Sequence, residues 1–374
     1  EKKSVPALNR ALQGLFAPAS TFKAVSVVAA ASAGYDLNAN YKCPSQVQVG
    51  TRAFQNFDSK NQGTMNMKKA IAVSCDTIWY QIAFDEWLRD GGLRPKSSAN
   101  DYFFKAAKAF NITQKVGIDL PSESSSRLAD RDYKKSWYQQ NKDFYCNYKE
   151  RATKAQQTPF LLQLAAENCV DGDKIRAGDA VNFSIGQGDT VVTPLKLTQM
   201  YAAIANGGTI WKPTVAKAII SNNDKVIKTF ESEKLGDIGV SPEIIAFLHD
   251  ALHEVTVSGT SAGVFAGFPL ATAGKTGTAQ VFGKNPNGRA KDDSAWYAAF
   301  APAAKPRYVA VMMVSQGGFG ASTSAVGVRK IYETLFGVKG GKIDQSAQLF
   351  KNNVPPIKLP KISPATRPAG EAKK

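Results

Sequence analysis

The chain has 374 residues and 43% hydrophobic content, which is ample for a large core in one big domain or two. Its 47 Lys and Arg residues against 31 Asp and Glu give a formal net charge of +16, which favours anionic partners such as lipid headgroups, cell-wall polymers or nucleic acid. No nucleic-acid motif accompanies this charge, so a solvated basic surface is the default interpretation. The sequence contains no apolar run of about 18 residues, so no transmembrane helix is predicted.

The first part of the chain predicts helices separated by loops. Residues 9–15 are expected to be helical, and the apolar run after Lys23 predicts a helix that is buried nearly all round and ends at Gly34. Residues 41–62 are loop-like, with room for a hairpin. Two helices are expected within residues 65–83, and an amphipathic helix over residues 101–110.

Residues 123–158 are polar, basic and rich in aromatic side chains, and they predict a long insertion beside a groove. Interleaved basic and aromatic residues also suit single-stranded nucleic-acid binding, but surface loops of this composition are common, so that interpretation is not favoured. The aromatic residues concerned are Trp137, Tyr138, Phe144, Tyr145 and Tyr148.

The remaining elements predict an α+β fold. Helices are expected over residues 193–206, 241–255 with Ser241 as N-cap, and 326–336, with strands within 211–230, 295–300 and 308–315. An antiparallel sheet covered by helices, with an inserted all-helical lobe and a groove between the lobes, fits this order. We expect residues 1–338 to form this domain and residues 339–374, where prolines alternate with lysines, to be a largely disordered tail.

Short motifs in three separate places carry the chemistry. Ser20-Thr21-Phe22-Lys23 places a serine and a lysine three residues apart, on one face of a helix, and a serine needs a base to become a nucleophile. A lysine with an ordinary pKa of about 10.4 serves as that base only if its surroundings lower the pKa by roughly 3 units. The other motifs are Ser74-Cys75-Asp76 and Lys275-Thr276-Gly277-Thr278.

Each motif alone has an ordinary structural explanation. Ser-x-x-Lys occurs by chance in many helices, Ser74-Cys75-Asp76 suits a helix cap, and threonines beside Lys275 suit strand packing. In this order, however, the motifs are the signature of penicillin-binding proteins and serine β-lactamases. The chain resembles the transpeptidase domain of a class B penicillin-binding protein over about residues 9–336. Further stretches that agree are residues 117–121, 184–188, 192–195 and 295–297.

The resemblance implies a D,D-transpeptidase that needs no metal or organic cofactor. Ser20 would be the nucleophile, Lys23 its base and Ser74 a proton relay. Lys275 would orient Ser74 and attract the substrate carboxylate, which Thr276 and Thr278 would bind beside the bare backbone of Gly277. The backbone N–H groups of Ser20 and Thr278 would form the oxyanion hole. Asp76, where asparagine is commoner, is similar to elongation-type members, and it opposes the base role of Lys23 by favouring its cation.

The resemblance also implies a setting and partners. Stem peptides, β-lactam antibiotics and a glycan-polymerising membrane protein would be partners, nucleic acid would not, and the enzyme would act on the outer face of the bacterial cytoplasmic membrane. The family's membrane helix, pedestal domain and the strands ahead of Asn9 are not recognised, so we expect an excised piece. Alternatives are a β-lactamase, a β-lactam sensor, a D,D-carboxypeptidase, or an inactive scaffold that binds wall peptides or a morphogenesis partner.

Cysteines and histidines give weaker indications. The spacing of the four cysteines fits no zinc motif, and it leaves open whether Cys146 and Cys169 pair or remain buried thiols. His249 and His253 are spaced as in a zinc-protease helix, but no third ligand suggests itself, so surface histidines are the default. With so few histidines, a Ser-His-Asp triad is not favoured.

Overall fold

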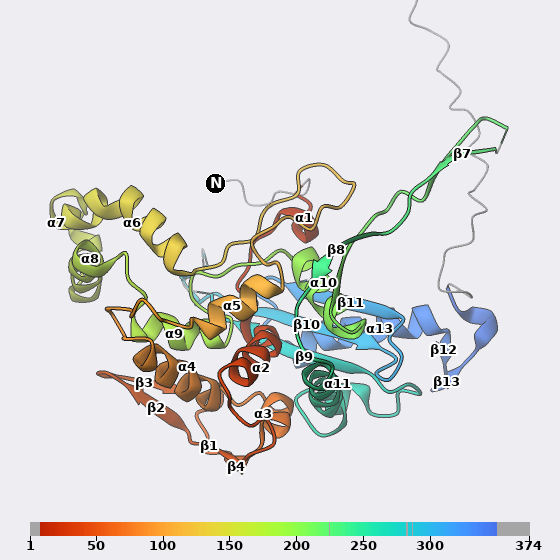
Figure 1. The fold of residues 1–374 in the computed structure, drawn as a ribbon, viewed down its shortest axis with the longest axis horizontal. Helices are drawn as coiled ribbons and strands as arrows, with labels where there is room; N and C mark the ends of the chain where they lie inside the picture. The colour runs from red at the N-terminus through yellow and green to blue at the C-terminus, as the bar shows by residue number, and fades with distance from the viewer. Residues whose placement is uncertain (1–7, 224, 282, 286, 350–374) are drawn as a thin grey trace, which may run out of the picture.

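A three-stranded antiparallel sheet forms the centre of the structure. The computed structural model describes residues 8–223, 225–281, 283–285 and 287–349 (Figure 1). The strands run in the order β11 (Tyr308–Val314), β10 (Ser294–Ala301) and β9 (Ala273–Ala279), so the predicted strands over residues 295–300 and 308–315 are confirmed. Lys275 of β9 lies opposite Ala298 of β10, and Gly277 lies opposite Trp296.

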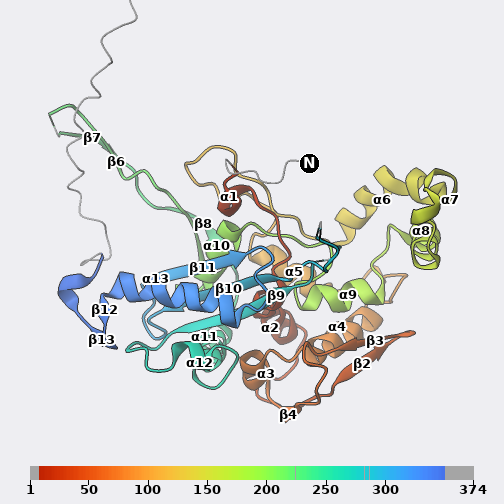
Figure 2. The same cartoon turned by 180° about the vertical axis from the view of Figure 1, so that it is seen from behind.

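Both faces of the sheet are covered by helices, which explains why every residue of β10 is buried. Trp296, Ala298 and Phe300 belong to the main core together with α2 (Lys23–Ser32), α10 (Pro194–Ala205) and α11 (Pro242–Val257). The alternate residues of β10 face a second core formed with α12 (Ala262–Phe265), η3 (Ala321–Ala325) and α13 (Val326–Phe336), which crosses the sheet in Figure 2. This layering confirms the predicted α+β architecture.

The helical lobe surrounds α2, which is buried over most of its length as predicted. It also contains α3 (Met67–Val73), α4 (Thr77–Arg89), α5 (Tyr102–Ala109) and α9 (Ala177–Ser184), while α1 (Arg10–Gln13) and the 3₁₀ turn η1 (Ala19–Phe22) lead into α2. Residues 41–62 contain the predicted hairpin: β2 (Gln46–Val49) pairs with β3 (Arg52–Gln55), flanked by β1 (Tyr41–Cys43), which pairs with β4 (Gly63–Met65).

Two arms project from opposite ends of the molecule (Figures 1 and 2). One is the hairpin of β6 (Ala218–Ile220) and β7 (Val226–Thr229), which extends from the pair of β5 (Thr209–Lys212) and β8 (Glu233–Asp237). The other consists of α6 (Arg131–Cys146), α7 (Tyr148–Arg151), η2 (Lys154–Gln156) and α8 (Pro159–Asp171), with α6 joined to α8 by a Cys146–Cys169 disulfide.

The helical arm gives the insertion predicted over residues 123–158 a helical structure that the sequence pattern does not specify. Asp130 accepts a hydrogen bond from the backbone N–H of Tyr133 at 2.9 Å and so caps α6, and Phe144 packs edge-on against Tyr148 one turn later. These local contacts stabilise a helix that buries only Lys134 and therefore carries little of the apolar periodicity that sequence reasoning depends on.

The ends of the described chain bear on other predictions. The expected boundary at residue 338 falls within β12 (Val338–Lys339), which pairs with β13 (Lys342–Ile343) ahead of η4 (Gln345–Ala347). Residues 350–374, which hold the prolines of the expected tail, lie outside the described residues. Within the described part, the outer edge of β11 pairs with no strand, and no helix has the length and apolar character needed to cross a bilayer.

Candidate active site

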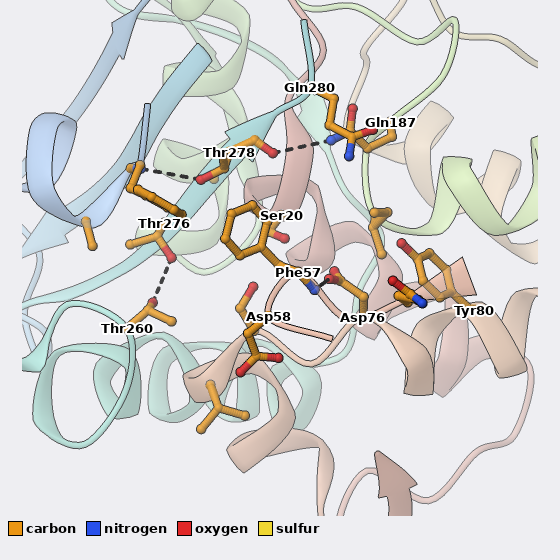
Figure 3. Close-up of a pocket in the computed structure, with 18 of the residues that line it drawn as sticks. Ser20, Phe57, Asp58, Asp76, Tyr80, Gln187, Thr260, Thr276, Thr278 and Gln280 are labelled. Carbon is orange, nitrogen blue, oxygen red and sulfur yellow. Dashed lines mark hydrogen bonds between the residues drawn. The ribbon is translucent and has the colours of Figure 1, made fainter. Parts of the chain in front are cut away.

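A groove of about 310 Å³ lies between β9 and the helical lobe (Figure 3). It brings together stretches that are separated by some 300 residues of sequence. Of the residues predicted from the motifs, Ser20, Ser74, Asp76, Thr276, Gly277 and Thr278 line it. Lys23 and Lys275 are fully buried, and their ammonium groups reach Ser74 from beneath.

The turn that carries Ser20 packs closely against two glycines, Gly186 and Gly277. Ala19 has a φ of +49°, a left-handed conformation that is unfavourable for a residue with a Cβ. Its N–H donates to the carbonyl of Gly186 at 2.8 Å, and a Cβ on Gly186 would lie 2.5 Å from the carbonyl oxygen of Ala19. A Cβ on Gly277 would lie 3.1 Å from Thr21 Cγ2. Glycine at both positions therefore lets the turn lie close to its neighbours.

Lys23 is the first residue of α2 and makes its polar contacts with the second motif. Its Nζ donates to Ser74 O at 2.8 Å, Ser74 Oγ at 3.1 Å and Asp76 Oδ1 at 2.6 Å. Burial lowers the pKa of Lys23, whereas the charge and hydrogen bond of Asp76 oppose that change. The site thus contains the environmental bias that a lysine base requires, together with a carboxylate that works against it.

Lys275 approaches the same hydroxyl from β9. Its Nζ donates to Ser74 Oγ at 2.8 Å and to the Thr276 carbonyl at 3.1 Å. Burial, and secondly the charge of Lys23, hold the pKa of Lys275 well below its usual value. Ser74 itself ends α3 with a φ of +61°, so its hydroxyl is presented between the two lysines by a strained backbone.

The two threonines of β9 line the groove beside Ser20. The hydroxyls of Thr276 and Thr260 share a hydrogen bond of 2.7 Å, and Thr278 Oγ1 accepts from the N–H of Gly320 at 3.4 Å (Figure 3). Gln187, from the 184–188 stretch, donates to the carbonyl of Thr278 at 3.3 Å. The hydroxyls are therefore held in place at the wall of the groove where the sequence predicts a substrate carboxylate.

Several features of the site escaped the sequence analysis. A disulfide joins Cys75, the middle residue of the second motif, to Cys43, a pairing that the sequence does not predict. Asn56 contacts the backbone of Asp76 at 2.9 Å. The exposed rings of Phe57 and Phe319 meet edge to face at 5.1 Å between centroids. These residues belong to no local pattern, and Cys75 within a motif was the one available signal.

The histidine prediction needs a correction. His249 and His253 are half-buried rather than simply exposed, and their rings contact the carbonyls of Ile204 and Thr272, each at 2.8 Å. Among the described residues, no group of three or more His, Cys, Asp or Glu side chains could hold a metal ion. Both rings thus tie α11 to neighbouring backbone.

The family model described as "Penicillin binding protein transpeptidase domain" matches residues 1–352 of the chain. The chain belongs to the penicillin-binding protein transpeptidase family. It is similar to peptidoglycan D,D-transpeptidase MrdA of Haemophilus influenzae, with 26% identity over 365 residues that cover 94% of this chain and 48% of the relative. The chain spans about half the length of the curated relatives it matches.

Solved structures agree with the family membership. One is a chain of a peptidoglycan synthase complex that coordinates polymerization and crosslinking, with 26% identity, a TM-score of 0.65, and coverage of 91% of this chain and 49% of the other. Penicillin-binding protein A of Mycobacterium tuberculosis, as a ceftriaxone acyl-enzyme, shares the fold at 21% identity with a TM-score of 0.63, over 89% and 63% of the two chains.

Proposed function

We propose that this chain is the catalytic domain of a serine peptidoglycan D,D-transpeptidase that cross-links stem peptides and is acylated by β-lactams. The observation that carries the proposal is the Ser74 hydroxyl, which receives hydrogen bonds from Lys23 at 3.1 Å and Lys275 at 2.8 Å, beside the groove that holds Ser20. Two amines converging on one hydroxyl next to an accessible serine suit the proton transfers of acyl transfer.

Acylation begins when the Ser20 hydroxyl oxygen attacks the carbonyl carbon between the last two D-alanines of a stem peptide. Neutral Lys23 accepts the serine proton, and burial of Lys23 favours this neutral form by lowering its pKa. Ser74 relays a proton onward to the leaving amine, the C–N bond breaks and D-Ala departs. Ser20 then carries the acyl group, which the amine of a neighbouring stem peptide attacks to form the cross-link.

Substrate positioning falls to β9. The terminal carboxylate of the stem peptide is bound by the hydroxyls of Thr276 and Thr278, with the Lys275 amine behind them, whose protonated form the incoming carboxylate favours. Gly277 leaves bare backbone against which an extended peptide can lie. The backbone N–H groups of Ser20 and Thr278 polarise the reacting carbonyl, and removing one such donor typically lowers the rate about 10²–10³-fold. No metal or organic cofactor takes part in these steps.

The proposed location is the outer face of the bacterial cytoplasmic membrane, with a glycan-polymerising membrane protein as partner. Both cysteine pairs are joined as disulfides, and disulfides persist in oxidising compartments outside the cytoplasm. The likeness to a chain of a peptidoglycan synthase complex supports the choice of partner. The excess of basic residues suits anionic wall polymers.

The test is the intact mass of the protein after incubation with a labelled penicillin, with Ser20→Ala as the matched control. A stable adduct on the native protein that is absent from the variant is the expected result. An adduct that disappears within seconds while the drug is consumed would indicate a β-lactamase instead. The absence of any adduct on folded protein would reject acyl transfer and favour a peptide-binding scaffold.

A stable adduct alone leaves a sensor or a carboxypeptidase as alternatives, so a second assay uses a D-Ala-D-Ala stem peptide with an added acceptor amine. Release of D-Ala with formation of the cross-linked dimer is expected of a transpeptidase. Release of D-Ala without dimer would identify a carboxypeptidase. No release from a protein that penicillin still acylates would identify a sensor.

A further inference from the structure

Asp76 stands at the N-cap of α4, yet its carboxylate does not cap that helix. An aspartate in this position ordinarily accepts hydrogen bonds from the first backbone N–H groups of the helix. Here Asp76 Oδ1 instead binds Lys23 at 2.6 Å, and Oδ2 accepts from the backbone N–H of Phe57 at 3.2 Å. Another group must therefore accept hydrogen bonds from the backbone N–H groups at the start of α4.

That group is the side chain of Asn56, which is 3% exposed. Its Oδ1 accepts from the backbone N–H groups of Asp76 at 2.9 Å and Thr77 at 3.2 Å. Its Nδ2 donates to the carbonyls of Pro44 at 2.8 Å and Lys60 at 2.9 Å. The Asn56 amide thus caps α4 from outside the helix. It also links the start of α4 to Pro44, which follows β1, and to Lys60 in the loop after β3.

We propose that Asn56 is a positioning residue for acylation, because it caps α4 in place of Asp76 and so leaves the Asp76 carboxylate free to hold Lys23. The proposal rests on the function proposed above. An asparagine suits this role because it supplies an acceptor to the two N–H groups and donors to the two carbonyls at once. Neither aspartate nor alanine can do both.

The consequence lies in the proton held by Lys23. Asp76 favours the ammonium form of Lys23, whereas burial favours the neutral amine that accepts the serine proton. Losing the external cap would let the Asp76 carboxylate turn back to α4 and leave Lys23. Placing a negative charge at position 56 would instead favour the ammonium. Other charged or titratable groups near this pair, which stay the same in every variant, are Lys275, Tyr80, Arg52 and Asp58.

The experiment measures the rate constant of penicillin acylation against pH for the native protein, Asn56→Ala and Asn56→Asp. We expect Asn56→Asp to acylate about 10-fold more slowly at neutral pH, and Asn56→Ala to have a plateau rate constant about 10-fold lower, because Asp76 then no longer holds Lys23 in position. The rising limb of the profile should move to lower pH in the alanine variant and to higher pH in the aspartate variant. Because the rate constant is taken from the approach of adduct to its own plateau, it does not depend on the fraction of folded protein.

Asn61→Ala is the matched control, since Asn61 lies in the same loop and its Oδ1 accepts from the N–H of Gly63 at 2.9 Å, away from Asp76. Its profile should equal that of the native protein. If the alanine variant fails to fold, Asn56→Ser keeps one acceptor and should show a smaller shift in the same direction.

Slower rates with an unshifted profile, or shifts of both variants in one direction, would reduce Asn56 to a structural residue and overturn the proposal. A native protein that forms no adduct would be a failure of the proposed function instead.

Discussion

Ser74 is the residue on which the polar contacts of the site converge. Its hydroxyl lies within hydrogen-bond distance of two buried lysines, and its carbonyl binds one of them. Burial lowers the pKa of both lysines; for Lys275 the charge of Lys23 adds to this effect, whereas for Lys23 the charge and hydrogen bond of Asp76 oppose it. A hydroxyl that both lysines contact can accept a proton from one of them and donate its own to the other.

Thr260 is expected to position Thr276, because the two hydroxyls share a hydrogen bond of 2.7 Å at the wall of the groove. Thr260→Val keeps the shape of the side chain and removes the hydroxyl. A hydrogen bond of this kind contributes about 0.5–1.5 kcal/mol, so penicillin acylation should slow roughly 2- to 10-fold. The measurement is the second-order rate constant of acylation, and Thr260→Ser, which keeps the hydroxyl, should restore most of it. Equal rates in the valine variant would contradict the role.

At the scale of elements, the disulfides differ in what they hold. Cys43–Cys75 is buried and joins β1 to the residue between Ser74 and Asp76, whereas Cys146–Cys169 joins two helices of the projecting arm. Both sets of cysteines have a similar separation in sequence, 32 and 23 residues, so the entropic stabilisation of the two loops should be comparable. Only the first disulfide is in a position to affect catalysis.

We therefore expect a double substitution of Cys43 and Cys75 by serine to slow acylation, and the same change at Cys146 and Cys169 to leave the acylation rate constant unchanged. Each double variant should lose stability, since removing a native disulfide typically costs about 2–5 kcal/mol. The measurements are thermal unfolding and the acylation rate constant of the folded protein. If both double variants, or neither, were slowed, the distinction between the disulfides would be wrong.

Helix α10 contains a buried lysine with no part in the proposed chemistry. Lys196 Nζ donates to the Asn111 carbonyl at 2.9 Å and to Gln199 Oε1 at 2.7 Å, and burial lowers its pKa to about 8 against the opposing charge of Glu123. An unfolded lysine titrates near pH 10.4. Between about pH 8 and 10.4 the unfolded chain thus holds a proton that the native protein has released, so this group makes stability rise with pH over that window.

Lys196→Met should abolish this pH dependence. The free energy of unfolding of the native protein minus that of the variant should increase by up to about 1.4 kcal/mol per pH unit across the window and stay flat below it. Denaturant unfolding at a series of pH values measures the difference. Lys105→Met, on an exposed position of α5, is the control and should give a flat line throughout. A flat line for Lys196→Met as well would show that Lys196 titrates as in the unfolded chain.

At the scale of the whole molecule, the groove depends on segments that meet only after folding. The motifs around Ser20, Ser74 and Lys275 could be found because each is a short local pattern whose side chains the structure brings together. Asn56 and Thr260 could not, since their roles come from contacts with segments that no local pattern links to them. The four cysteines allow three pairings, so their connectivity was likewise beyond sequence reasoning.

The α+β class followed from the order of elements, but two parts of the fold did not. Helix α6 lies in the predicted insertion, but the sequence does not indicate a helix there because α6 buries almost nothing and so lacks a clear apolar period. Strands β1 to β4 form pairs of their own instead of joining the main sheet, which depends on register and packing rather than on strand propensity. Both segments lie at the rim of the molecule (Figure 1), although the strands contribute Cys43, Val47 and Phe54 to the main core.

Phe57 and Phe319 join the two sides of the groove. Phe57 follows β3 in the helical half, Phe319 follows β11 in the sheet half, and both rings line the groove that contains Ser20. Phe57 and Phe319 are 57% and 55% exposed, so little other than the partner ring keeps each ring in place. An aromatic pair of this kind contributes about 0.5–1.5 kcal/mol, which is small enough for a ligand to separate the rings and large enough to slow its entry.

Phe57→Ala and Phe319→Ala should each raise the acylation rate for a β-lactam with a bulky side chain about 2- to 10-fold relative to a small penicillin. The double variant should resemble either single variant, because the second substitution removes a ring that has already lost its partner. Phe160→Ala, a 70% exposed phenylalanine on α8, is the control and should change neither rate. If both β-lactams instead reacted more slowly with the single variants, the rings would grip the ligand rather than obstruct it, and the contact across the groove would be part of the binding site.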